Sequence, residues 1–350
     1  MSVDRISLRP GHEISRVIRG GWQLAGGHGP VNPAEQIADM VAFAEAGITT
    51  FDCADIYTGV EEMIGAFRMS YLNSHGAEAL ARVKVHTKLV PDLEALPTLG
   101  RDYIRRIVDT SLKRLRMERL DLVQFHWWDY GVPRYLDAVG WLDELRREGK
   151  VAHIGGTNFD TARTLEIIGA GVPLVSMQVQ YRLIDARAER LLVPAALQND
   201  MAILCYGSVA GGFIGDRWLG QPEPVGLLEN RSLTKYKLVI DDFGGWDLFQ
   251  ALLRALRRVA DRHRTDIATV ASAAMLEKPG VAAVIVGARN RSHLPRNLQI
   301  TGVGLTPADR AEIAAVLAQG TVPEGDTYTL ERDRGGRHGQ IIKYNLNKAS

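Results

Sequence analysis

Short runs of apolar residues alternate along this chain with longer segments whose apolar positions repeat every three or four residues. The short runs predict β-strands, and the longer segments predict helices that bury one face. We expect strands at residues 17–22, 49–55, 83–90, 120–127, 151–158, 175–181, 202–208 and 281–288. We expect helices at residues 33–46, 60–72, 101–117, 134–148, 160–170, 187–199, 246–278, 291–299 and 306–318.

This alternation predicts an α/β fold with a parallel sheet, because each strand must return through a right-handed helical crossover. Eight such units close into a single-domain (β/α)₈ barrel, the TIM-barrel architecture. We expect the barrel domain at residues 1–320 and a tail at residues 321–350, which either covers the barrel mouth or is disordered. A doubly wound dinucleotide-binding sheet is disfavoured, since GGWQLAGGHG after the first strand lacks the GxGxxG fingerprint.

Composition narrows the classes of partner. The 350 residues include 42 Lys and Arg against 41 Asp and Glu, so no basic excess points to nucleic acid or a membrane surface. The first residues lack the apolar core of a secretory signal, and the longest aliphatic run, VAAVIV, is too short to cross a membrane. Cys53 and Cys205 form neither a CxxC pair nor a metal-binding pattern. We therefore expect a cytoplasmic protein with no metal site.

Polar residues follow the predicted strands at the edge where a parallel barrel carries its active site. Asp52, Lys88 and His126 end the second, third and fourth strands, and Tyr57 lies just beyond the second. Taken singly, the aspartate is more often a helix or turn cap, the lysine a solvated loop residue, and the histidine a core residue. Titratable groups gathered on consecutive strands of one rim instead favour a functional site.

Several segments carry a family resemblance. They are FDCADIY, EEMIG, HTKL, LDLVQFHW, GKVAHIGGTNF, MQVQY and VIVGARNRSHLPRN, in this order. The chain resembles the aldo-keto reductases along nearly its whole length. The resemblance implies an NADP(H)-dependent oxidoreductase that interconverts aldehydes or ketones and alcohols by hydride transfer. It implies four catalytic residues, namely Asp52, Tyr57, Lys88 and His126.

The implied chemistry explains these residue types. As hydride reaches a carbonyl carbon, charge develops on the oxygen, and Tyr57 is expected to act there as general acid and base. A free tyrosine titrates near about 10, and a nearby Lys88 ammonium is expected to lower that value. Asp52 is expected to hold Lys88 in its charged form, and His126 to orient the carbonyl by a hydrogen bond.

The resemblance also implies cofactor contacts. Thr157, Asn158 and Gln178 match residues that hold the nicotinamide amide, and Tyr206 matches the ring that stacks on the nicotinamide. The other expected cofactor contacts are Gly21, Trp22, Gly207, Ser208, Val209, Gly287, Ala288, Arg289, His293, Arg296 and Asn297. Trp22, Trp127 and Trp128 are expected to wall a dry substrate pocket, with core packing as the alternative.

Two segments depart from the family pattern. YGSVAGG stands where the family more often has YSPLGGG, so a hydroxyl near the pyrophosphate is displaced. Arg289 suits a 2′-phosphate and favours NADPH, while NADH stays possible. His293 and Arg296 stand where the family commonly has Arg and Glu, which bears on the contacts to adenine.

The sequence leaves the substrate, the direction of reaction and the oligomeric state open. Residues 209–245 are expected to form a long irregular loop that folds over the cofactor. The alternative function is a cofactor-binding regulatory or partner subunit of the same fold with little turnover, since fold alone does not fix activity. The intact set of four catalytic residue types favours the enzyme, whose partner is then a small-molecule carbonyl or alcohol.

Overall fold

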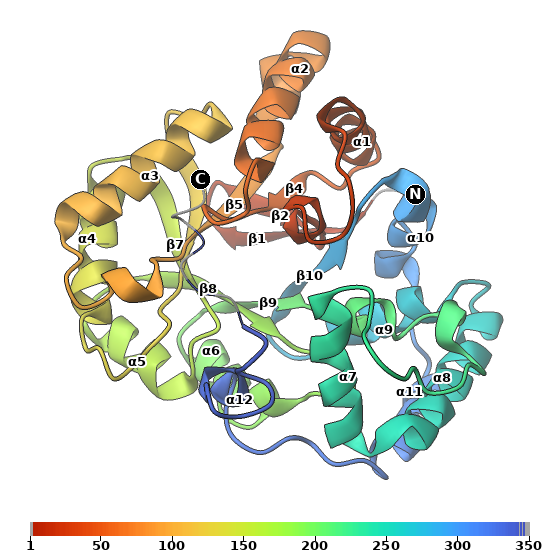
Figure 1. Cartoon of the computed structure of the whole chain (residues 1–350). Coiled ribbons are helices and arrows are strands. Elements are labelled where there is room, and N and C mark those ends of the chain that lie inside the picture. Colours follow the sequence, from red (N-terminus) through yellow and green to blue (C-terminus); the bar gives the residue numbers. More distant parts are fainter. Residues whose placement is uncertain (1–2, 343, 345, 347–350) are drawn as a thin grey trace.

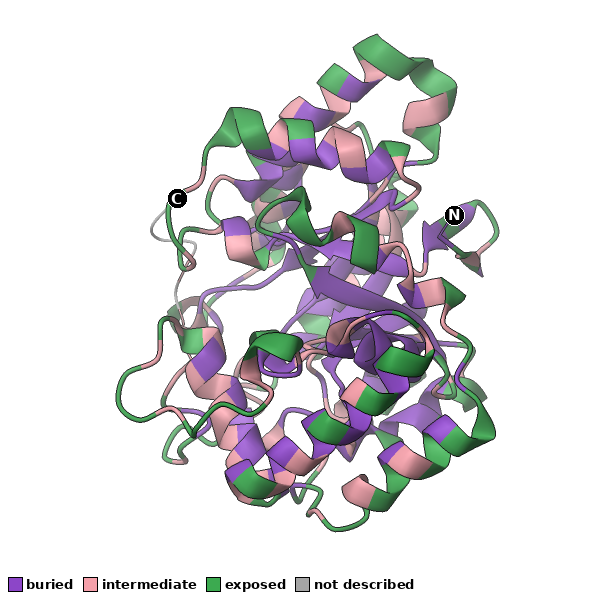
Figure 2. Cartoon of the chain, turned by 90° about the vertical axis from the view of Figure 1, so that its right-hand side faces the viewer, coloured by how far each residue is buried: buried purple, intermediate pink, exposed green. Residues whose placement is uncertain are grey.

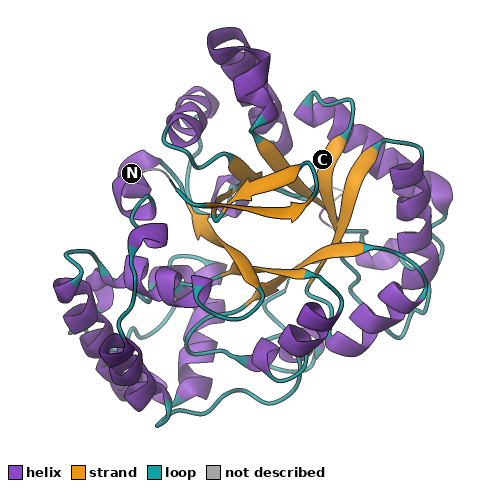
Figure 3. Ribbon diagram, turned by 180° about the vertical axis from the view of Figure 1, so that it is seen from behind, coloured by secondary structure: helices purple, strands orange, loops and turns teal. Residues whose placement is uncertain are grey.

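The eight predicted strands pair side by side and close into a barrel in the computed structural model, which describes residues 3–342, 344 and 346 (Figures 1 and 3). All neighbouring strands are parallel, in the order β10-β3-β4-β5-β6-β7-β8-β9. The strands are β3 (Val17–Gly20), β4 (Thr50–Asp52), β5 (Lys84–Leu89), β6 (Leu120–Phe125), β7 (Val151–Thr157), β8 (Leu174–Gln180), β9 (Ala202–Tyr206) and β10 (Val281–Gly287). The predicted single-domain (β/α)₈ barrel is confirmed.

Helices surround the strands as predicted, although several of them differ in their bounds from the prediction (Figure 1). They are α1 (Pro33–Glu45), α2 (Val60–Ala81), α3 (Arg101–Leu115), α4 (Tyr135–Arg147), α5 (Thr161–Gly169), α6 (Leu192–Gln198), α8 (Gly245–Arg262), α9 (Ile267–Leu276), α10 (Leu294–Asn297) and α11 (Pro307–Leu317). Helix α2 extends past residue 72 as two helical pieces, because Gly76, at the non-helical φ of 82°, kinks the chain between them. The segment 246–278 is two helices, because Asp266 caps a new helix that begins at Ile267, its side chain accepting from the Thr269 amide.

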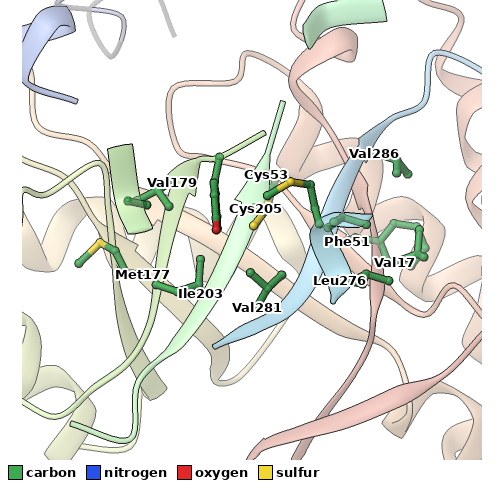
Figure 4. Packing of buried hydrophobic residues seen from close by; sticks show 14 of the residues in the cluster. Val17, Phe51, Cys53, Met177, Val179, Ile203, Cys205, Leu276, Val281 and Val286 are labelled. Atoms are coloured by element: carbon green, nitrogen blue, oxygen red, sulfur yellow. The ribbon is translucent and has the colours of Figure 1, made fainter. Parts of the chain in front are cut away.

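Alternate strand residues face two apolar regions. Ile18 and Leu204 belong to the cluster inside the barrel, whereas their neighbours Val17 and Cys205 belong to the larger cluster between strands and helices. Figure 4 shows part of the larger cluster, including Leu276 of α9. The helices are buried along the stripe that faces the strands and exposed on the other side (Figure 2).

An N-terminal hairpin that the sequence pattern did not predict lies across the barrel (Figure 3). Its strands are β1 (Arg5–Arg9) and β2 (His12–Ser15). Leu8 and Ile14 are buried with Ile18 and Leu122 at the amino-terminal ends of the barrel strands. The hairpin thus closes the face opposite the strand ends that carry the candidate site. Its short strands hold too few apolar positions for their period to stand out.

The segment 209–245 is not the irregular loop that we expected. It contains the 3₁₀ turns η4 (Ala210–Gly212) and η5 (Asp216–Trp218), followed by helix α7 (Arg231–Phe243). The Asn230 side chain accepts from the Leu233 amide and caps the helix. Leu233, Tyr236, Val239, Ile240 and Phe243 form its buried face. The glycine-rich stretch before Asn230 obscured this periodic pattern.

The end of the described chain packs on the barrel through helix α12 (Thr329–Arg332) (Figure 1). Glu331 accepts hydrogen bonds from Arg187, with the closest contact at 3.1 Å, and both side chains are buried. Arg332 donates to the carbonyl of Asn158 at 2.8 Å, beside the end of β7. The tail therefore contacts the same strand ends that carry the candidate site.

Candidate active site

The site is built around a buried ion pair between neighbouring strands. The Lys88 ammonium on β5 lies 2.6 Å from the Asp52 carboxylate on β4 and also donates to the Cys53 carbonyl at 2.8 Å. The other carboxylate oxygen accepts from Gln178 at 2.6 Å and from Gln124 at 3.1 Å. A buried pair of charges is tolerated only when such further hydrogen bonds satisfy it. The carboxylate is thus held by three side chains from three other strands.

Tyr57 lies directly over this pair. The Lys88 ammonium is 5.1 Å from the centroid of the Tyr57 ring. Burial raises the pKa of Tyr57 to about 12, although Lys88 opposes that rise. Burial alone would lower the pKa of Lys88, but Asp52 and Tyr57 together raise it above its ordinary value. At neutral pH the site therefore presents a protonated phenol next to an ammonium, rather than the lowered tyrosine pKa that we expected.

His126, just after β6, is held by a backbone carbonyl. Its Nδ1 lies 3.0 Å from the oxygen of Thr157. Burial, with a contribution from Arg332, lowers the pKa of His126 to about 3, so the ring is neutral. Because a carbonyl oxygen can only accept, Nδ1 carries the ring hydrogen and Nε2 presents a lone pair. Among the described residues Nε2 has no hydrogen-bond partner.

The expected contacts to the nicotinamide amide lie beside the ion pair. The backbone N–H of Asn158 donates to the backbone carbonyl of Gln178 at 3.0 Å, and Asn158 has the left-handed φ of 61°. The Tyr206 hydroxyl donates to the Asn158 side chain at 2.8 Å. Thr157 is buried and supplies the carbonyl that holds His126. Strands β7, β8 and β9 therefore bring all four of these residues together.

Gly21 and Trp22 follow β3 at the same rim. The Gly21 amide donates to the Asp52 carbonyl at 2.7 Å, and a Cβ at Gly21 would lie 2.8 Å from that oxygen. Only glycine fits this close approach. The Trp22 ring, 39% exposed, lies 5.1 Å from the Tyr57 ring. Its indole Nε1 donates to Ser232 of α7 at 3.2 Å, so α7 reaches across to the first strand.

The turn after β9 offers its backbone rather than side chains. Gly207 has φ 73°, and a Cβ there would lie 2.5 Å from the Tyr236 hydroxyl. The buried Ser208 hydroxyl lies 3.2 Å from the Ser272 hydroxyl of α9. Val209 immediately precedes η4, and its carbonyl accepts from the Gly212 amide at 2.9 Å. The Ser208 hydroxyl, which is displaced relative to the family pattern, is therefore engaged in a contact inside the protein.

The segment after β10 carries the expected contacts at the phosphate end. Gly287 and Arg289 are exposed, and Ala288 is buried. The Arg289 guanidinium lies against Gly29, where an added Cβ would be 2.9 Å from its Nη2. The Arg289 carbonyl accepts from Gln36 of α1 at 2.6 Å. The backbone of this residue is thus fixed while its guanidinium faces the loop after β3.

The three further positions in this segment differ in their surroundings. Asn297 is buried, and its side-chain Nδ2 has no hydrogen-bond partner among the described residues. Arg296 already contacts the Gln299 side chain at 3.1 Å and lies 3.8 Å from Asp266. His293 is exposed. An arginine engaged in this way is less suited to a second phosphate contact than the exposed Arg289 side chain.

The three tryptophans differ from one another. Trp128 lies edge-on to His126 at 4.3 Å between ring centroids, and its Nε1 donates to the Pro91 carbonyl at 2.8 Å. Trp127 is fully buried, with Nε1 bonded to carbonyls of its own loop at 2.9 and 3.0 Å. The geometry therefore supports core packing for Trp127 and a position at the site for Trp22 and Trp128.

Several residues near the site were missed by the sequence analysis. Gln124 lies inside the fourth predicted strand, where its contact with Asp52 depends on a partner 72 residues away. Tyr328 of the tail lies 6.1 Å from His126 between ring centroids. Lys235 lies on α7, in the segment that we expected to be irregular. Only the glutamine had a signal in the sequence, as a polar residue within an apolar run.

Fold and site together define a (β/α)₈-barrel enzyme with its polar cluster at the carboxyl ends of the strands. The sequence profile of the Aldo/keto reductase family matches residues 16–318. The chain belongs to this family and is an oxidoreductase. Members are typically NAD(P)H-dependent and act on small-molecule carbonyl compounds. Across the described residues, every helix is too short or too polar to cross a membrane.

Individual relatives agree with the family assignment. Aldo-keto reductase YhdN of Bacillus subtilis (strain 168) is 27% identical over 320 residues, which cover 88% of this chain and 91% of that protein. An uncharacterized oxidoreductase of Mycobacterium tuberculosis is 29% identical over 306 residues, covering 85% and 88%. The solved structure of the glycerol dehydrogenase AKR11B4 from Gluconobacter oxydans has a TM-score of 0.75 at 22% identity and covers 93% of this chain and 98% of that one. This last likeness supports the fold alone.

Proposed function

We propose that this protein is an NADP(H)-dependent oxidoreductase that interconverts aldehydes or ketones and alcohols by hydride transfer. One observation carries the proposal: the Lys88–Asp52 pair, 2.6 Å apart, lies beneath the ring of Tyr57. A phenol next to a fixed ammonium is suited to donate a proton and to stabilise the phenolate left behind. This arrangement serves the oxygen of a carbonyl that is being reduced.

The residues present fit a nicotinamide cofactor. Gln178, Asn158 and Tyr206 converge beside the ion pair. At the far end, the buried Nδ2 of Asn297 has no hydrogen-bond partner within the described residues. We assign the amide contacts to Thr157, Asn158 and Gln178, and the stacking contact to Tyr206. When bound, the reduced nicotinamide supplies the hydride. Arg289, with its guanidinium at the rim, is proposed to pair with a 2′-phosphate and so to favour NADP(H) over NAD(H).

In the reductive direction, Tyr57 donates its hydroxyl proton to the carbonyl oxygen as negative charge develops there. Lys88 stabilises the resulting phenolate, and Asp52 keeps Lys88 charged and in place. Trp22 and Trp128 exclude water, which strengthens these electrostatic interactions. The substrate carbonyl is thus activated by one donor, the tyrosine hydroxyl.

We assign His126 a role that differs from the orientation of the carbonyl that we expected from the sequence. Its neutral Nε2 carries a lone pair and cannot donate to a carbonyl oxygen. It can accept a hydrogen bond from the hydroxyl of the alcohol form or from a hydroxyl next to the carbonyl. We propose that His126 positions the alcohol in the oxidative direction, by accepting this hydrogen bond.

We propose that residues 1–320 form the barrel domain and that the tail covers the substrate side of its mouth. Arg332 donates to the carbonyls of Trp128 at 2.9 Å and of Asn158 at 2.8 Å, and Tyr328 lies near His126.

The alternative function is a partner or regulatory subunit with the same fold. Such a subunit would bind the cofactor but would have no chemical need for the catalytic set. Turnover separates these two readings.

The experiment is NADPH consumption with a panel of simple aldehydes and ketones, comparing the wild type with Tyr57→Phe and with Tyr71→Phe as the control. Tyr71 is a buried tyrosine of α2, away from the strand ends. We expect Tyr57→Phe to lose about 100-fold or more in kcat, because general acid catalysis contributes roughly 10²–10⁴-fold. Cofactor affinity should remain. NADPH binding without turnover of any carbonyl by the wild type would favour the regulatory subunit.

A further inference from the structure

A lysine ammonium lies among three tyrosine rings at the mouth of the site. Lys235 of α7 places its Nζ 5.3 Å from the centroid of Tyr206, 5.7 Å from that of Tyr236 and 5.6 Å from that of Tyr328. These rings come from strand β9, helix α7 and the tail. Aromatic faces attract a cation, but they leave its three N–H donors unused.

In the part of the chain that the structure describes, this ammonium has no anionic partner. Within the described ranges, Lys235 makes neither a hydrogen bond nor an ion pair through its side chain. The neighbouring carboxylates are already engaged, since Arg187 binds Glu331 at 3.1 Å and Asp185 at 2.9 Å. Burial lowers the pKa of Lys235 to about 8, with Glu331 opposing the shift. The charge is therefore held at a cost that an incoming anion would offset.

The position of Lys235 points to the substrate rather than to the cofactor phosphates. Tyr328, one of its three rings, lies 6.1 Å edge-on from His126. Tyr236 packs over the turn at Gly207 and Gly211, where a Cβ at either glycine would meet its ring atoms. The turn that would approach the pyrophosphate is thus covered by Tyr236, and the ammonium lies 5.3 and 5.6 Å from the ring centroids of Tyr206 and Tyr328.

We propose that Lys235 recognises a carboxylate or phosphate group of the substrate, so that the enzyme acts on anionic carbonyl compounds. This inference rests on the proposed function. The Tyr328 ring separates the Lys235 ammonium from the His126 imidazole. The acid group of the substrate must therefore stand several bonds from its carbonyl group. A 2-oxo acid, whose carboxylate adjoins the carbonyl, is too short to reach both. Compounds such as an aldehyde acid or a sugar phosphate have the required spacing.

The test compares 4-carboxybenzaldehyde with 4-methylbenzaldehyde, a pair of similar size that differs in charge. Lys235→Met is measured beside Lys235→Arg and beside the control Lys237→Met. Lys237 is on the same helix but pairs with Glu223 at 2.6 Å and with Asp241 at 2.5 Å. Thermal unfolding of each variant establishes that it is folded. Dissociation constants of both aldehydes for the NADP⁺ complex, where no reduction occurs, are measured by calorimetry alongside kcat/KM.

We expect the wild type to prefer the carboxylate, and Lys235→Met to reduce that preference about 10-fold or more, as loss of a charged hydrogen bond does. Lys235→Arg should retain part of the preference, and Lys237→Met should leave it unchanged. Equal affinity of the wild type for both aldehydes would overturn the proposal. So would a Lys235→Met variant that weakens only NADP⁺ binding, since that result would assign the ammonium to the cofactor phosphates. Failure of NADP⁺ itself to bind the wild type would instead refute the proposed function.

Discussion

Gln178 donates its side-chain amide to the Asp52 carboxylate at 2.6 Å, across 126 residues of sequence. Gln124 donates to the same carboxylate oxygen at 3.1 Å from another strand. Gln178, on β8, is also assigned to the nicotinamide amide of the cofactor. Gln124, on β6, is assigned no contact with the cofactor. We therefore propose that Gln178 joins cofactor binding to the ion pair and that Gln124 only supports the pair.

This difference predicts separable effects for two matched substitutions. Gln124→Leu and Gln178→Leu should each lower kcat about 10- to 100-fold, because a hydrogen bond to a charged group contributes roughly 1.5–3 kcal/mol. Only Gln178→Leu should also raise the dissociation constant of NADPH, measured by fluorescence titration. An equal weakening of NADPH binding by both variants would contradict the assignment of Gln178 to the cofactor.

The proton on Tyr57 predicts opposite pH dependences for the two directions. Burial raises its pKa to about 12, so the phenol stays protonated through neutral and moderately alkaline pH. Carbonyl reduction, which needs the acid form, should be flat over this range. Alcohol oxidation needs the phenolate and should accelerate as pH rises toward that pKa. Initial rates with saturating cofactor at each pH check both profiles.

Lys88→Met removes the group that lowers the pKa of Tyr57. We expect alcohol oxidation to fall about 100-fold or more near neutral pH, and its alkaline rise to begin at higher pH. Lys84→Met, at the other end of β5 with its ammonium on the Ala81 carbonyl, is the control. An unchanged alkaline rise in Lys88→Met, in a folded variant, would argue against the proposed role of the lysine.

Arg289 is expected to discriminate between the two nicotinamide cofactors. Arg289→Ala should raise the dissociation constant of NADPH about 10-fold or more and leave that of NADH nearly unchanged, because the charged contact is made only to the extra phosphate. Arg291→Ala removes an exposed arginine two residues away and serves as the control. Equal losses of affinity for NADPH and NADH would show that Arg289 contacts a group common to both.

The hairpin that closes the barrel predicts a sensitivity to acid. His12 lies 3.1 Å from His86 inside this closure, and burial lowers the pKa of His12 from 6.5 to about 3. The unfolded chain therefore binds more protons below pH 6.5, and the stability present above that pH is lost progressively toward pH 3.

His12→Asn should thus reduce the loss of stability between pH 7 and pH 5, by an amount on the order of 1–2 kcal/mol. Thermal unfolding of the variant and the wild type at both pH values measures this difference. The control is His75→Asn, on the exposed part of α2. This variant should lose as much stability between pH 7 and pH 5 as the wild type does. Parallel losses in His12→Asn and the wild type would count against His12 as a source of the acid sensitivity.

The sequence by itself determined the barrel and the residues at its rim. The period of apolar positions reports which backbone a segment adopts and which face it buries, so the eight strands were predicted within a few residues. Parallel strands in a barrel share one carboxyl edge, and this constraint alone placed Asp52, Lys88 and His126 close together. Helix α7 and the N-terminal hairpin were missed because short or glycine-flanked patterns are weak.

Only the tertiary structure decided how these side chains are partnered. The hydrogen bonds of Gln124 and Gln178 to Asp52 join positions 72 and 126 residues apart, which no local pattern encodes. The neutral form of His126 depends on burial and on one carbonyl of β7. Lys235 gains its tyrosine surroundings only where α7 and the tail meet over the strand ends. Periodicity fixes local backbone and burial, whereas charge states and partners follow from groups that closure of the barrel brings together.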